Sequence, residues 1–99
     1  MRVMMKVSIP VEAGNKALKE GSLSKTMMEF VEKMKPEASY FLPKNGRRTA
    51  IFVFDLKDPS SIPIAVEPFF MGLNALVEMT PVMNAADMKA GVEKAMKAV

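Results

Sequence analysis

Apolar and polar positions alternate along the first nine residues. The apolar residues at odd positions share one face of an extended segment: Val3, Met5, Val7 and Ile9. The opposite face carries Met4, Lys6 and Ser8. A period of two is typical of a half-buried strand. We therefore expect a strand from Arg2 to Ile9, ended by Pro10.

The pattern changes to a helical period between Glu12 and Lys35. Apolar side chains recur there at spacings of three and four, beside charged ones: Met27, Phe30, Val31 and Met34. This spacing predicts an amphipathic helix with one face on the core. Gly21 and Ser22 should interrupt or bend it.

A hairpin signal follows the next predicted strand, which runs from Pro36 to Leu42. The Asn45-Gly46 pair favours a two-residue type I′ turn, because both positions need positive φ. Counting back from this turn pairs Leu42 with Thr49, Tyr40 with Ile51, and Ala38 with Val53. It also places Phe41, Ala50, Phe52 and Phe54 together on the other face.

The second half of the chain predicts a strand, a short helix, a strand and a final helix. The strand runs from Arg48 to Leu56, and Asp58 or Ser61 can cap the helix after it. Because Pro68 removes a helical hydrogen bond, we expect Ile62 to Met71 to be irregular or kinked, with Gly72 ending it. The last strand is expected from Asn74 to Met83. From the N-cap residue Asn84, a helix with Met88, Val92, Met96 and Val99 on one side completes the chain.

This order of elements predicts an α+β class with a ferredoxin-like β-α-β-β-α-β plan and an additional C-terminal helix, in one domain over residues 1–99. Both main helices then cover one face of a four-stranded antiparallel sheet. The open face would carry apolar residues: Met4, Tyr40, Leu42, Ile51 and Val53. A monomer would expose them, so we expect a homodimer, with the C-terminal helix or the last strand extending the contact.

Three segments resemble the dimeric α/β-barrel superfamily. They are the opening strand (Met1 to Pro10), the Thr49 to Pro59 segment that runs from strand into helix, and Glu78 to Met83. The chain is most similar to small stand-alone families of unknown function. The superfamily includes cofactor-free monooxygenases, haem-degrading enzymes, muconolactone isomerase and ligand-sensing domains, so the resemblance implies a fold and no single function. The haem enzymes and many monooxygenases use His or Trp in the pocket, and this sequence has neither.

Several polar and aromatic residues are candidates for a ligand site. By parity, Lys6 and Ser8, with Glu78 and Thr80, face the open side of the sheet on neighbouring strands. Lys6 and Glu78 have two interpretations. They could do acid–base chemistry in a half-closed barrel, or, as we favour, they form a cross-strand ion pair at the rim of the dimer interface. Tyr40 either binds a ligand through its hydroxyl or packs against its neighbours on the strand, with its hydroxyl at the edge of the packed region. Phe69 and Phe70 either line a cavity or pack under the sheet edge.

Composition narrows the chemistry further. The 99 residues contain no cysteine and no histidine, so we expect no disulfide, no metal site and no cofactor. The 14 basic and 11 acidic residues are scattered, and we expect neither nucleic acid nor membrane as a partner, and a cytoplasmic location. We interpret Arg47 and Arg48 as a solvated hairpin tip. The 11 methionines suit an adaptable apolar pocket, although Met also fills ordinary cores, the interpretation we favour.

Two functions remain open at this point. The first is a non-catalytic dimeric module that binds a small apolar or aromatic ligand or serves in assembly. The alternative is a cofactor-free isomerase or monooxygenase acting on a cyclic or aromatic substrate, with Glu78 as base and Lys6 or Tyr40 stabilising an oxyanion. The absence of a catalytic motif favours the non-catalytic module.

Overall fold

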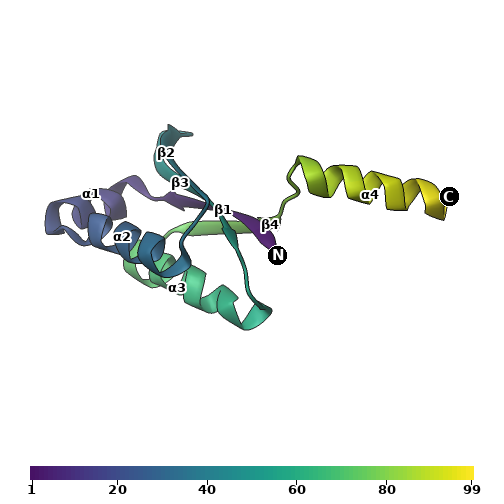
Figure 1. Cartoon of the computed structure of the whole chain (residues 1–99). Helices are drawn as coiled ribbons and strands as arrows, with labels where there is room; N and C mark the ends of the chain where they lie inside the picture. The colour runs from purple at the N-terminus through teal and green to yellow at the C-terminus, as the bar shows by residue number, and fades with distance from the viewer.

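One four-stranded antiparallel sheet forms the centre of the molecule (Figure 1). The computed structural model describes all of residues 1–99. The strands are β1 (Arg2–Ile9), β2 (Ala38–Lys44), β3 (Arg47–Asp55) and β4 (Leu76–Pro81). Their order across the sheet is β2-β3-β1-β4, and every neighbouring pair is antiparallel. The predicted α+β class is confirmed, and the arrangement is compatible with the ferredoxin-like plan.

Helices cover one face of this sheet, as Figure 1 shows. The helices are α1 (Val11–Glu20), α2 (Ser22–Met34), α3 (Ile62–Leu73) and α4 (Ala85–Ala98), and a 3₁₀ turn, η1 (Pro59–Ser61), precedes α3. The fourth helix, α4, projects away from the rest of the molecule and contains no buried residue. The other face of the sheet is left without a covering layer.

Gly21 divides the predicted long helix into α1 and α2. Its φ of 81° lies in the left-handed region that glycine occupies without strain. Its N–H donates to the carbonyl of Leu18 at the end of α1. The interruption predicted from the sequence is confirmed as a complete break between two helices.

The β2–β3 hairpin has the predicted register. Asn45 and Gly46 form the loop with φ of 54° and 74°, and Lys44 pairs with Arg47. Tyr40 is opposite Ile51, as counted back from the turn. The two-residue turn therefore determines which side chains of β2 and β3 share a face.

The prediction that Gly72 ends the third helix is wrong. α3 continues through Gly72 to Leu73, and Asn74 takes the left-handed capping position with φ of 51°. Pro68 lies inside this helix on its exposed side. The buried side of α3 lies in the core and outweighs the lost backbone hydrogen bond. It consists of Ala65, Val66, Phe69 and Leu73.

Three predicted strands differ from the observed ones at their ends. The segment predicted from Arg48 to Leu56 is β3 at Arg47–Asp55, one residue earlier at both ends. The segment predicted from Pro36 to Leu42 is β2 at Ala38–Lys44, so it extends up to the turn. The segment predicted from Asn74 to Met83 is β4 at Leu76–Pro81, because Asn74 is used to cap α3.

The core lies between the sheet and α1–α3. The odd-numbered residues of β1, from Val3 to Ile9, are at most 1% exposed. Three phenylalanines pack around Phe30, with ring centroids 4.4 Å away for Phe52, 5.6 Å for Phe54 and 5.3 Å for Phe69. All the apolar residues of this core come from the helix-covered side, which leaves the open face to other contacts.

Candidate functional site

The open face of the sheet is the first candidate surface. Register places six apolar side chains on it: Met4, Tyr40, Leu42, Ile51, Val53 and Leu76. Five of these are the residues predicted from parity. Tyr40 and Leu76, on the two edge strands, are 66% and 62% exposed. In the single chain this face is an apolar surface in contact with water.

Lys6 and Glu78 are direct cross-strand partners on this face. Lys6 Nζ lies 3.5 Å from Glu78 Oε2. The Lys6 side chain is 28% exposed and that of Glu78 is 75% exposed, so water reaches the carboxylate freely. In the single chain the pair therefore has the geometry of a solvent-screened ion pair.

The other predicted polar residues flank this pair. Ser8 is opposite Leu76, and Thr80 is opposite Met4. Tyr40 lies in the same row across the sheet as Lys6, but Ile51 separates them. Since neighbouring strands are about 4.8 Å apart, Tyr40 and Lys6 stand about two strand spacings apart. The open face brings Lys6, Ser8, Glu78 and Thr80 together and keeps Tyr40 at the far edge.

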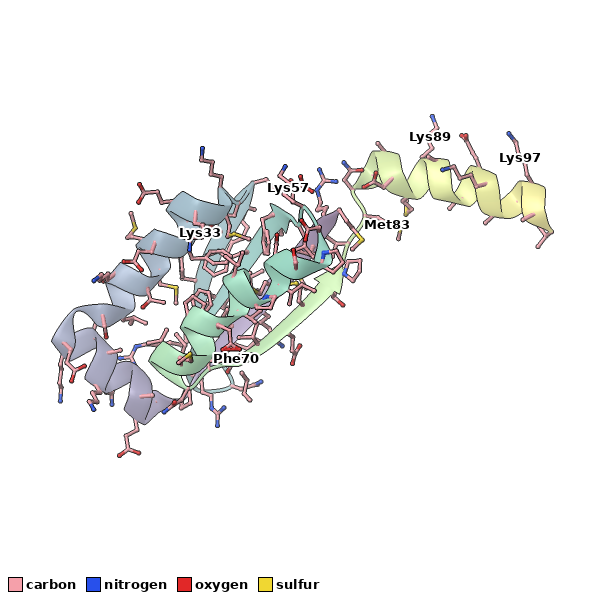
Figure 2. The ribbon with its side chains drawn as sticks, turned by 90° about the horizontal axis from the view of Figure 1, so that it is seen from below. Lys33, Lys57, Phe70, Met83, Lys89 and Lys97 are labelled. Carbon is pink, nitrogen blue, oxygen red and sulfur yellow. The ribbon has the colours of Figure 1, made fainter.

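Phe69 and Phe70 lie on α3, on the other side of the sheet. Phe69 is fully buried and packs against Phe30 and Phe52. Phe70 is 40% exposed and points outward from α3 in Figure 2. Phe69 therefore packs in the core, and neither phenylalanine shares a surface with the polar candidates.

A pocket that the sequence did not predict lies between α2 and the β2–β3 hairpin. Its volume is about 510 Å³. Six apolar residues line it: Ile9, Leu23, Met27, Met28, Phe41 and Leu42. Ser24, Pro43, Arg48 and Thr49 complete the wall. The pocket is mainly apolar, with one charged residue in its wall.

Arg48 is the charged residue of this pocket. Its register partner on β1 is Ile9, so it projects from the helix-covered face. The Nη1 group donates a hydrogen bond of 3.0 Å to Oδ1 of Asn15 in α1. A Cβ atom on Gly14 would lie 2.8 Å from the same nitrogen, so the glycine makes room for the guanidinium.

The interpretation of both arginines as a solvated hairpin tip is correct for Arg47, which is exposed, and wrong for Arg48, which is half-buried. The signal was available in the sequence. The Asn45-Gly46 turn that pairs Tyr40 with Ile51 also gives Arg48 the parity of Ala50 and Phe52. A charged residue at a core-facing position indicates that it is placed there for a partner.

A cluster of charges at the start of β1 has a structural role. The Met1 ammonium lies 2.8 Å from Asp55 Oδ1, and Lys57 Nζ lies 2.6 Å from Asp55 Oδ2. The hydrogen bond from Lys57, followed by that from the N-terminus, lowers the pKa of Asp55 from 3.8 to about 2. Asp58 accepts hydrogen bonds from Ser60 as the cap of η1, which lowers its pKa also.

The chain has no group of three metal-ligating side chains, and none of its helices has the length and apolar character to cross a membrane. No protein-family model matches the chain, and no curated protein matches it.

Proposed function

We propose that the protein is a non-catalytic homodimeric module that binds a small apolar or aromatic molecule. The observation that carries this proposal is the open face of the sheet, where Tyr40 and Leu76 are more than 60% exposed beside other apolar residues. Covering apolar surface contributes about 25 cal/mol per Å². A second copy of the same face is the simplest cover, and the resemblance to dimeric α/β barrels supports the same arrangement.

The C-terminal helix supports a second copy independently. Met88, Val92 and Met96 are 55%, 54% and 67% exposed, at helical spacing on one side of α4. Figure 2 shows Lys89 and Lys97 on the same side of α4. If the apolar side of α4 packs on the partner in a two-fold dimer, symmetry makes the same contact twice, which covers both helices.

The pocket between α2 and the hairpin supports the ligand-binding part of the proposal. Sites for small molecules in proteins are mostly apolar hollows of about 300–1,000 Å³ with a few polar groups. The pocket has this size and this lining. Its methionines, Met27 and Met28, have the flexibility to adapt to a ligand.

The catalytic alternative has less support. Glu78 would need to be desolvated to act as a base near neutral pH, and its side chain is 75% exposed in the single chain. Tyr40 is separated from Lys6 by Ile51. The geometry therefore does not assemble the base and the oxyanion-stabilising group that the enzyme needs.

Light scattering after gel filtration tests the dimer. The wild type is expected at about twice the 10.9 kDa chain mass. Tyr40→Glu with Leu76→Glu places charges on the most exposed apolar positions of both edge strands and should give a monomer. Met71→Glu, at an 82% exposed position of α3, is the matched control and should leave the dimer unchanged. A monomeric wild type at micromolar concentration would overturn the proposal.

A variant of α4 separates the contribution of the helix from that of the sheet. Val92→Glu changes the centre of the apolar side of α4 and leaves the open face intact. If α4 takes part in the interface, this variant should shift the monomer–dimer equilibrium toward monomer. An unchanged dimer would restrict the interface to the open face.

A further inference from the structure

Arg48 stands out among the charged residues because of its surroundings. Its register partner is Ile9, and Phe41 and Met27 line the same pocket. Arg48 is half-buried, so part of its guanidinium lies against apolar side chains, where its N–H groups need acceptors. Asn15 supplies one acceptor, whereas guanidinium carries five N–H donors. Most of the N–H donors of Arg48 are therefore available to a ligand.

No carboxylate of the chain neutralises this guanidinium. The ion pairs involve the N-terminus, Arg2, Lys6 and Lys57, and Arg48 is in none of them. Arg2 shows the contrast, since it binds both Glu37 and Asp87. The charge of Arg48 is thus unmatched at the wall of an apolar pocket, and an anionic group on a ligand would match it.

The guanidinium is also held in place before any ligand arrives. Asn15 in α1 accepts from Nη1 at 3.0 Å, and Gly14 leaves the space that this nitrogen occupies. Because a neutral amide orients the group without cancelling its charge, the arginine loses little freedom when it binds an anion. This arrangement favours a carboxylate, which fits the planar fork with two parallel hydrogen bonds.

We propose that the pocket between α2 and the hairpin binds an amphipathic monocarboxylic acid, whose carboxylate pairs with Arg48 and whose apolar body lies against Leu23, Met27 and Phe41. The proposal rests on the ligand-binding part of the proposed function, and its site shares Leu42 and Thr49 with the open face. Arg47 is exposed and is not part of the pocket wall. One lining guanidinium and a mainly apolar wall select a ligand with one anionic end.

Two probes of equal chain length separate the charge from the apolar body. Decanoate carries a carboxylate and 1-decanol a neutral hydroxyl, and both are used below the concentration at which they aggregate. Calorimetry gives affinity, and NMR of ¹³C-methyl methionine locates the site. We expect both probes to shift Met27 and Met28 and to leave the exposed Met71 unchanged. Decanoate should bind about 10-fold to 100-fold more tightly, as expected for a charge-assisted pair.

Arg48→Met tests the pairing, and Arg47→Met is its matched control. Arg48→Met should reduce the affinity for decanoate to that for decanol and leave decanol binding unchanged, which also shows that the variant is folded. Arg47→Met should preserve the preference for decanoate. Equal affinity for both probes in the wild type, or an equal effect of both substitutions, would overturn the role of Arg48 and leave a neutral apolar site.

Two other outcomes have different meanings. If neither probe shifts Met27 and Met28, the ligand-binding part of the proposed function fails together with this inference. If Met27 and Met28 instead shift with protein concentration alone, and Met88 and Met96 shift with them, the pocket is occupied by α4 of a second copy. That result would overturn the acid site and support the dimer.

Discussion

The guanidinium of Arg2 lies 3.2 Å from Oδ2 of Asp87 and joins the first strand to the last helix across 85 positions of the sequence. The same Asp87 carboxylate accepts a hydrogen bond from the backbone N–H of Asn84, and the Asn84 side chain accepts one from the backbone N–H of Asp87. This reciprocal capping box fixes the first turn of α4. Arg2 also binds Glu37, whose hydrogen bond is the main cause of the raised pKa of Arg2.

Replacing Asp87 with Ala should loosen α4 without disturbing the core. The variant loses one half of the capping box and the contact with Arg2, and the loss of a helix cap costs about 1 kcal/mol. Since α4 contains no buried residue, hydrogen exchange should accelerate at its amides while those of β1 and β3 keep their protection. Glu93→Ala, farther along the same helix, is the control with a smaller effect. Equal acceleration in the sheet would contradict this account.

Phe69 and Phe70 should differ strongly in their effect on stability, although they are neighbours. Phe69 is fully buried and packs against both Phe30 and Phe52, so Phe69→Ala should lower the free energy of unfolding by about 3–5 kcal/mol. Phe70 is 40% exposed, and its truncation should cost about 1 kcal/mol. Urea denaturation of both variants measures the difference. Similar losses would mean that Phe70 is covered by a partner.

The fold could be predicted where a local signal determines a long-range relationship. The Asn45-Gly46 turn requires two positive φ angles, and this requirement sets every pair between β2 and β3. Odd and even positions along β1 then point to opposite faces, which separates the core residues from those of the open face. The same argument places Lys6 and Glu78 on one face of strands that the predicted topology makes neighbours, and the observed register makes them direct partners.

The errors came from competition between local and tertiary effects. Gly72 and Pro68 disfavour a helix locally, but the buried side of α3 holds Phe69 and Leu73 in the core, and burial outweighs propensity. The pocket was missed for another reason. Its wall combines α2, β1 and both hairpin strands, and no periodicity within one element reveals a hollow between several. The one sequence signal for the pocket was that Arg48, a charged residue, falls at a core-facing position of β3.

Asp55 should titrate well below an ordinary aspartate. Its pKa is lowered to about 2 from 3.8, first by the hydrogen bond from Lys57 and then by that from the N-terminus. A depressed pKa means that the contribution of Asp55 to stability is complete above about pH 4 and is lost as the pH falls through about 2. A ¹³C NMR titration of the carboxyl group measures this midpoint.

Lys57→Ala should raise the pKa of Asp55 toward 3.8, because it removes the largest cause of the shift. Lys33→Ala is the matched control. Lys33 borders the same surface hollow as Asp55 and Lys57 but makes no ion pair with the carboxylate, and Figure 2 labels both lysines. An equal rise in both variants would attribute the shift to general positive charge instead of the hydrogen bond.

The Lys6–Glu78 pair decides between a binding module and an enzyme. Glu78 is 75% exposed at the edge strand β4, so as a rim ion pair it should contribute no more than about 1 kcal/mol. Denaturant melts of Glu78→Gln, Lys6→Met and the double variant give the coupling energy directly. In the proposed dimer Glu78, on the edge strand β4, would lie at the rim of the interface where water still reaches it, and we then expect three melts close to that of the wild type. If the dimer instead buries both groups, each single substitution leaves an unpaired charge and should cost about 3–5 kcal/mol, while the double variant regains most of the loss. That pattern would place a desolvated carboxylate beside an ammonium group between the subunits, and the cofactor-free enzyme would then be better supported than the binding module.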